Sequence, residues 1–172
     1  MMDKKMERSN KEKILRKLAK LLAPAGFSRS KPTFFTRVNM PIIEFIHLHK
    51  FTFDSSFRVH LGIRVINDPF VAVALNGPDS DSYRGSIGSA SARYDFQYGE
   101  EEQSLDSCAR CVAKFSIDIA EPWFDSCRDF GALISGPESP LDVEAQAALR
   151  NALEGAVEQR HVATTQELLN AP

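Results

Sequence analysis

Residues 42–66 read IIEFIHLHKFTFDSSFRVHLGIRVI, and this stretch decides the fold. Apolar and polar side chains alternate through 42–53 and again through 57–66, which is the pattern of two half-buried strands. The short polar dipeptide Asp54-Ser55 predicts a tight turn between them. The hairpin built around this turn would pair Leu48 with Leu61, Ile46 with Ile63, Lys50 with Val59 and His49 with His60.

This register separates the hairpin side chains into two sets. The apolar face holds Ile46, Leu48, Val59, Leu61, Ile63 and Val65. The opposite face holds Phe45, His47, His49, Phe51, Arg58, His60 and Arg64. A slip by one residue would mix the two sets, because side chains alternate with a period of two. We therefore expect the first face to pack into the core and the second to carry any binding site.

An amphipathic helix is predicted before the strands. Five apolar residues recur at helical spacing, namely Ile14, Leu15, Leu18, Leu21 and Leu22. Ser9 followed by Glu12 has the spacing of a capping box at a helix start. Pro24 and Gly26 predict where the helix ends.

Further strands are expected at 33–38 and 70–75, and a weaker hairpin at 83–88 and 93–98. From Leu105 onward the apolar period becomes helical, and Ser139-Pro140 resembles a helix start. A helix followed by antiparallel strands and then by helices indicates an α+β fold. We expect a meander sheet of about five to six strands, with the C-terminal helices packed on one face.

The chain is predicted to consist of one α+β domain, residues 1–135, and a C-terminal helical extension, residues 136–172. Gly136-Pro137 breaks the chain between them, and the apolar stripe that follows is thin: Leu149, Leu153 and Val157. The extension is therefore expected to be dispensable for folding.

Composition bounds the class of protein. At 172 residues, 43% hydrophobic and 26% charged, the chain matches an ordinary globular domain. It has no apolar run long enough for a membrane helix and a charged N-terminus, so we expect a cytoplasmic protein without membrane contact. The three cysteines, Cys108, Cys111 and Cys127, are too few for a disulfide framework and are expected to be buried and reduced.

Charge is unevenly distributed along the chain. Residues 1–37 carry eleven Lys and Arg against three Asp and Glu, a net +8, and the remainder carries ten against twenty, a net −10. A basic start can mark a nucleic-acid contact. The alternative is a basic helix lying against its own acidic body. We expect no strong nucleic-acid binding, because lysines alone lack the planar forks that read bases.

Several segments appear in the order and spacing of a known family. They are AGF at 25–27, TFFTR at 33–37, IEFIHL at 43–48, FRVHLGI at 57–63, YRGSIG at 83–88 and EPWF at 121–124. Over residues 12–134 the chain resembles the bacterial domain-of-unknown-function family 4304. The resemblance implies a compact α+β fold and a bacterial source, and it implies no activity, since the family has none assigned.

The histidines form the sharpest chemical pattern. His47 and His49 lie two apart on one predicted strand, with His60 opposite, and three such imidazoles can bind zinc facially. Arg58 and Arg64 on the same face would repel a cation, so a polar outer sheet face is the alternative. Aromatic and cationic side chains together also suit an anionic ligand, an acidic protein or a nucleic acid.

No nucleophile elbow, zinc-protease motif or phosphate-binding loop is present, and no cofactor is predicted. The first hypothesis is a non-enzymatic protein-interaction or ligand-binding module, of the kind to which small bacterial immunity proteins belong. Its acidic body would suit a basic partner. The second is an enzyme that uses the histidine-lined face, with or without a bound metal.

Overall fold

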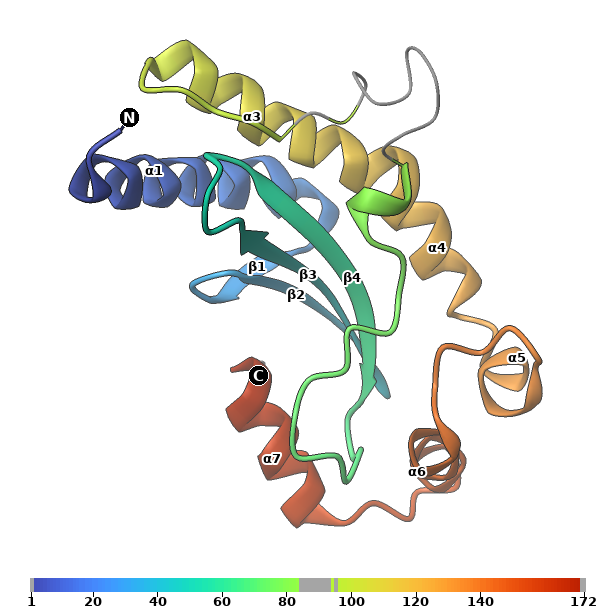
Figure 1. The fold of residues 1–172 in the computed structure, drawn as a ribbon. Helices are drawn as coiled ribbons and strands as arrows, with labels where there is room; N and C mark the ends of the chain where they lie inside the picture. Colours follow the sequence, from blue (N-terminus) through green and yellow to red (C-terminus); the bar gives the residue numbers. More distant parts are fainter. Residues whose placement is uncertain (1, 84–93, 95, 171–172) are drawn as a thin grey trace.

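The computed structural model describes residues 2–83, 94 and 96–170 and has the α+β architecture expected from the sequence (Figure 1). A long helix, α1 (Lys4–Leu22), leads through a short turn into an antiparallel sheet, and further helices follow the sheet. Within the described residues the sheet has four strands rather than five to six.

The strands form a meander in which each pairs with the next. They are β1 (Ser28–Lys31), β2 (Phe34–Asn39), β3 (Ile42–Lys50) and β4 (Phe57–Val65). The sequence pattern missed β1, because its four residues are polar or charged and show no alternation. The expected strand at 33–38 corresponds to β2.

The predicted register of the central hairpin is wrong by two residues. His60 lies opposite His47 rather than His49, and His49 lies opposite Arg58. The reason is the connection: residues 51–56 form a loop instead of a tight turn, and the Phe51 amide donates to the Ser56 carbonyl across its base. A shift of two residues preserves the faces, since the side-chain period is two. The predicted division into two faces is therefore right, although the partners are not.

The outer edge of β4 is covered by an extended segment, residues 76–80. The Asn76 side chain bonds both backbone groups of Ile63, the Gly77 amide donates to the Leu61 carbonyl, and Ser80 Oγ accepts from the Val59 amide. A side chain at Gly77 would lie 2.7 Å from the Leu61 carbonyl oxygen, so glycine permits this close approach. Covering an edge strand in this way removes a site for unwanted pairing.

One of the expected strands does not appear within the described residues. Residues 70–75 are irregular, because their carbonyl groups bind a buried arginine described below. The hairpin expected at 83–88 and 93–98 falls largely outside the described residues. Of its second arm, Gln97 forms an isolated bridge with Ser56.

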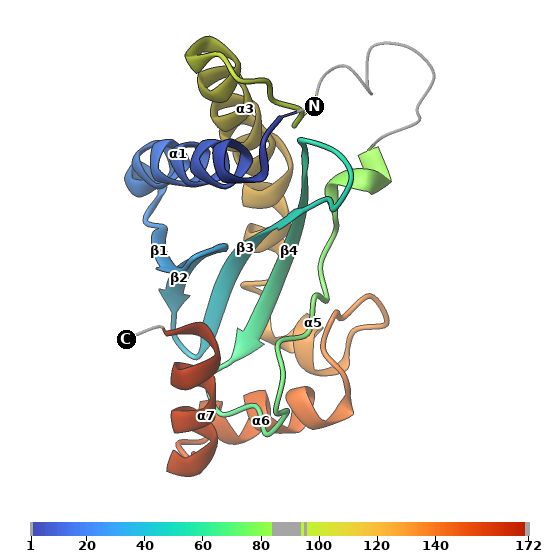
Figure 2. The ribbon, with the colours of Figure 1, turned by 60° about the vertical axis from the view of Figure 1, so that its left-hand side comes forward.

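The apolar face of the sheet is covered by α1 and by α3 (Glu102–Phe115), which a π-helical turn, Ser116–Ala120, joins to α4 (Glu121–Ser126) (Figure 2). The expected capping box does not start α1. The helix begins at Lys4 with Asp3 at its N-cap position, six residues before Ser9, and Glu12 pairs with Arg16 and Arg29 instead. Lys17 of α1 lies 2.6 Å from both Glu102 and Asp106 of α3, so the basic helix does lie against its own acidic body.

The last three helices divide between the two faces, which corrects the expectation that they share one. They are α5 (Phe130–Ser135), α6 (Val143–Leu153) and α7 (Gln159–Leu169). Asp142, not Ser139, caps α6, by accepting from the Ala145 amide. Leu149 of α6 joins the main core, whereas Leu169 of α7 packs against Ile43 and Phe45 on the opposite face. Both helices therefore bury core residues.

Two further findings bear on the class of protein. None of the helices in the described part of the chain combines the length and apolar character needed to cross a bilayer. The three cysteines are free, and Cys108 and Cys127 are buried while Cys111 is half-buried.

Candidate functional site

The seven residues expected to form a site lie on or beside the sheet face opposite α1 and α3. The structure divides this face into two halves. The half nearest α7 is covered by that helix and by residues 66–73, and it holds Phe45 and Arg64. The other half holds His47, His49, Arg58 and His60, with Phe51 just beyond the end of β3.

Phe45 is a core residue and not a binding residue. Its ring is completely buried against Ile43 and Leu169. The ring crosses β4 at Gly62, where a Cβ atom would lie 2.1 Å from Phe45 Cζ. Gly62 is therefore required by packing, because any side chain there would collide with the ring.

Arg64 is likewise structural. Arg64 is only 3% exposed, and its guanidinium donates to Thr165 Oγ1 of α7 at 2.7 Å. It also donates to three backbone carbonyls, those of Asp68, Phe70 and Ala72, at 2.7–3.0 Å. Burial lowers the pKa of Arg64. Its hydrogen bonds join β4, the irregular segment and α7, so the side chain is unavailable to a ligand.

Within the described residues, α7 and residues 66–73 leave the other half of the face open, and we call it the uncovered half. It carries a row of rings that crosses three strands. Phe34 on β2, His47 on β3 and His60 on β4 are directly opposite one another. The ring centroids of Phe34 and His47 are 4.3 Å apart, those of His47 and His60 are 6.1 Å apart, and both pairs are stacked. All three rings are half-buried. We call these three residues the aromatic row.

The histidines of the aromatic row are neutral at pH 7. Burial lowers the pKa of His47 to about 4. Burial also lowers the pKa of His60, and the nearby Arg58 lowers it further. His47 Nδ1 lies 3.2 Å from the Thr33 carbonyl oxygen, which only accepts, so this contact places the imidazole proton on Nδ1.

Three other residues border the row. His49 is exposed, and its ring meets the Phe51 ring edge-on at a centroid distance of 6.0 Å. Arg58 forms ion pairs with Asp79 and Asp81, each at 3.2 Å. Its charge is thereby balanced within the protein. The uncovered half is consequently an aromatic surface with little net charge, and less cationic than the sequence suggests.

The zinc hypothesis required three convergent imidazoles. His49 and His60 are not opposite each other, and His47 and His60 stack instead of converging. Among residues 2–83, 94 and 96–170, no group of three or more His, Cys, Asp or Glu side chains is placed to hold a metal ion.

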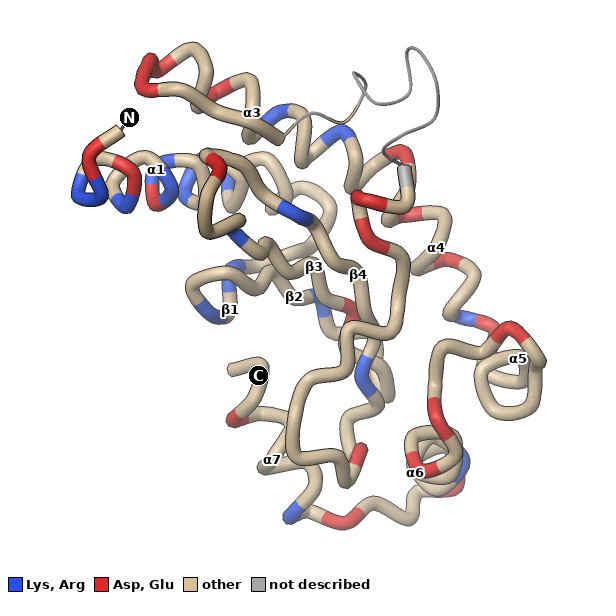
Figure 3. The backbone as a smooth tube through the Cα atoms, viewed as in Figure 1, with Lys and Arg blue, Asp and Glu red and all other residues tan. Residues whose placement is uncertain are grey.

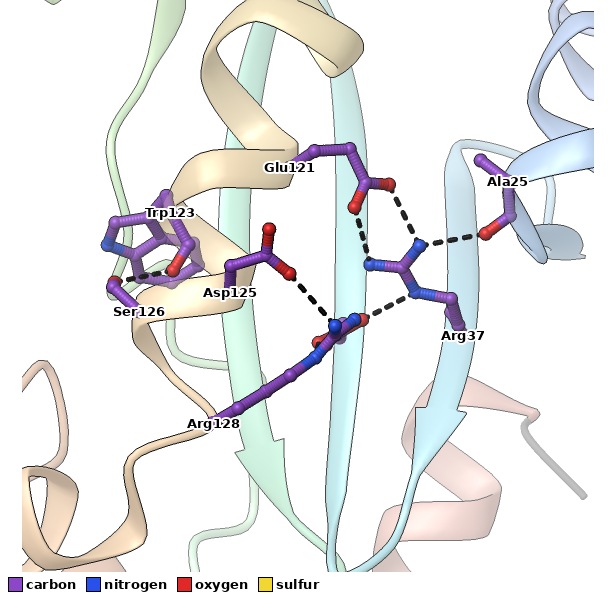
Figure 4. A network of polar contacts seen from close by, with 8 residues as sticks. Ala25, Arg37, Glu121, Trp123, Asp125, Ser126 and Arg128 are labelled. Atoms are coloured by element: carbon purple, nitrogen blue, oxygen red, sulfur yellow. Dashed lines mark hydrogen bonds and ion pairs between the residues drawn. The ribbon is translucent and has the colours of Figure 1, made fainter.

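Sequence reasoning missed a second polar cluster, on the helix-covered face (Figure 4). Arg37 of β2 donates to Glu44 of β3 at 2.6 Å, to both oxygens of Glu121 on α4 at 2.8 and 3.1 Å, and to the Ala25 carbonyl. Arg128 reaches Asp125 at 2.8 Å and Glu44 at 3.6 Å. We call Arg37, Glu44, Glu121 and Arg128 the buried ion network after its centre, the Glu44 side chain, which is 1% exposed, whereas Arg128 at its edge is 46% exposed.

One sequence signal could have revealed it. Glu44 falls on the apolar face of the β3 pattern, between Ile42 and Ile46, and such a carboxylate needs a partner. The charges of the network are matched two against two, and the Arg37 guanidinium also lies 4.3 Å from the centre of the Phe27 ring. Since every group is occupied by another, the network fits a structural role and not a ligand site.

Comparisons of the chain with protein-family models, with curated proteins and with solved structures found no match.

Proposed function

We propose that this protein is a non-enzymatic interaction module whose aromatic row, together with His49, receives a protein partner. The observation that supports this most is the unequal covering of one sheet face. One half of the face is sealed by α7 and residues 66–73, while three stacked rings and an exposed histidine remain on the other half. Partly buried aromatic side chains of this kind are typical anchors of protein interfaces.

Binding fits these side chains better than catalysis does. A general base works best when its pKa lies near the operating pH, and the pKa of His47, at about 4, makes it a weak base. Its Nδ1 is engaged by Thr33, and its ring is held between two others. Rings fixed in this way lose little conformational entropy when a partner covers them.

A small antagonist, such as an immunity protein that binds a toxin, is one form of this function. The support is a small domain without an active-site motif that leaves an aromatic surface uncovered. In that case the gene of the partner is expected beside the gene of this protein.

Site-specific photo-crosslinking in the source cells tests the proposal. A benzoylphenylalanine at position 49 reports on the uncovered half, and one at position 143 is the control, because Val143 is 80% exposed on α6, far from the row in sequence. We expect one discrete protein adduct from position 49 that is absent from position 143. No adduct, or the same adducts from both positions, would overturn the proposal.

A further inference from the structure

A basic pocket adjoins the aromatic row. It has a volume of about 440 Å³ and lies between α1 and the end of the β1–β2 hairpin. One stripe of α1 supplies most of its wall, because residues three and four apart share a helix face. The lining residues are Arg8, Lys11, Glu12, Leu15, Arg29 and Pro32.

Part of this lining is occupied by internal pairing. Arg29 donates to both carboxylate oxygens of Glu12, each at 2.9 Å, and to the Pro32 carbonyl. Arg16 adds another contact to Glu12. The hydrogen bond from Arg29, above all, lowers the pKa of Glu12 to about 2. These groups form a fixed wall whose own charges are satisfied.

Arg8 and Lys11 differ from Arg29. Neither makes a hydrogen bond or an ion pair with any residue in the described part of the chain. Lys11 is nevertheless half-buried, whereas Arg8 is exposed. The two unpaired cations share the pocket with the exposed ring of Pro32, whereas Leu15 is only 1% exposed, and this arrangement favours an anion with a short hydrocarbon stem.

The pocket lies on the α1 side of the sheet and the aromatic row on the opposite face, and the two meet at the β1–β2 turn. Pro32 of the pocket directly precedes Thr33, whose carbonyl contacts His47. Lys11 is also close enough for its charge to act on the His47 imidazole. A partner that lies on the row and extends past the β1–β2 turn therefore reaches the pocket.

We propose that Arg8 and Lys11 bind the carboxylate of an Asp or Glu in an acidic segment of the protein that covers the aromatic row. This inference rests on the proposed function and names the chemistry of the partner. A nucleic acid fits the pocket less well, because stable binding commonly uses about six to ten phosphate contacts and only two unpaired cations line the pocket. The net −10 of residues 38–172 repels a polyanion with many phosphates more strongly than a short segment that carries one or two carboxylates.

Nuclear magnetic resonance titration of the full chain tests the pocket directly. The probe is the peptide acetyl-Glu-Phe-Glu-Phe-amide, with the Gln-Phe-Gln-Phe peptide, inorganic phosphate and a single-stranded oligonucleotide as comparisons. We expect the acidic peptide alone to shift the amide signals of Lys11, Leu15 and Arg29 at millimolar concentration. No shift, or an equal shift with phosphate or the oligonucleotide, would overturn the inference.

Matched variants sharpen the titration. The double substitution R8Q/K11Q should weaken peptide binding at least about tenfold, since it removes both charge-assisted contacts to the peptide carboxylate. The control K4Q/K5Q removes the same charge from the first turn of the same helix, outside the pocket, and should leave the affinity unchanged. Equal losses from both variants would mean that net charge alone attracts the peptide, and the site would be refuted.

The crosslink at position 49 separates the two proposals. If R8Q/K11Q leaves the adduct at full yield, the aromatic row binds a partner and the pocket inference is wrong. The opposite result is also informative. If the protein with Arg8 and Lys11 intact forms no adduct from position 49, while the acidic peptide still shifts the amide signal of Lys11, the proposed function is wrong and the carboxylate site remains.

Discussion

The two faces of the same sheet carry two polar clusters that differ in how completely their groups are paired. On the helix-covered face, Glu44 is only 1% exposed, and the buried ion network gives each charge an opposite partner from another element. On the other face, the three rings of the aromatic row are half-buried and His49 is exposed. Figure 3 shows how charged residues spread over the rest of the molecule.

The difference indicates how to separate a structural polar cluster from a candidate site. Buried charges that satisfy one another stabilise one arrangement of the chain, and removing one member leaves the others unpaired. Half-exposed aromatic side chains without a covering element leave apolar surface for a partner to bury. Stability measurements should therefore respond to the first cluster, and binding measurements to the second.

The largest expected effect comes from removing the cover of both faces. A chain ending at Ser135 loses Leu141 and Leu149 from the main core and Leu169 and Thr165 from the other face. The sequence suggested that residues 136–172 are dispensable, whereas this packing favours the opposite outcome. We expect the truncated chain to lose its cooperative thermal transition, as followed by circular dichroism. A chain ending at Asn170 is the control, and a retained transition in the shorter chain would restore the original domain division.

The buried ion network gives the next largest effect. Glu44→Gln keeps the shape of the side chain but leaves Arg37 and Arg128 short of one negative charge. We expect a loss of about 3 kcal/mol in the free energy of unfolding, because removing one partner of a buried pair leaves an uncompensated charge. Urea denaturation measures it, with Glu158→Gln as a surface control whose pair with Arg160 is exposed. A loss below about 0.5 kcal/mol would mean that the network contributes little.

Overpacking beneath α7, on the half of the sheet face that holds Phe45, should reduce the free energy of unfolding somewhat less than Glu44→Gln does. Gly62→Ala places a methyl group 2.1 Å from Phe45 Cζ, so the ring has to move. We expect a loss of about 2 kcal/mol in the free energy of unfolding. The double substitution Gly62→Ala/Phe45→Leu should recover part of that loss, because leucine leaves more room above β4. Losses that simply add would show that the two side chains do not interact.

The aromatic row predicts a dependence on pH. The pKa of His47 is about 4 in the folded protein and near 6.5 when unfolded, so the unfolded chain binds the proton more readily. The contribution of His47 to stability is thus complete above pH 6.5 and is lost as the pH falls towards 4. We expect the free energy of unfolding to fall by about 1 kcal/mol between pH 7 and pH 5 on account of His47. This value is discounted for the partial exposure of its ring. A His47 signal that titrates near pH 6.5 in the folded protein would contradict this.

The sequence predicted the two faces of the sheet but not the residues that cover them. Alternation fixes which side chains share a face, and it placed His47 and His60 correctly on one surface. It could not reveal that a six-residue loop, 51–56, shifts the pairing by two. Nor could it reveal that Thr165 and Leu169 would cover Arg64 and Phe45, since contacts between distant segments leave no local pattern. Glu44 differs, because its place between Ile42 and Ile46 on the apolar face was a local signal that a partner is needed. Only the identity of its partners, Arg37 and Arg128, left no local pattern.

The most direct test of the account replaces His49 by alanine and measures stability and partner capture on the same protein. Crosslinking from a benzoylphenylalanine at position 34, within the aromatic row, reports the capture. We expect His49→Ala to change the free energy of unfolding by less than about 0.5 kcal/mol, as for other exposed positions, and to reduce the crosslink yield severalfold. An undiminished yield, or a loss of stability comparable to that of Glu44→Gln, would show that the uncovered half of the sheet is not a binding surface.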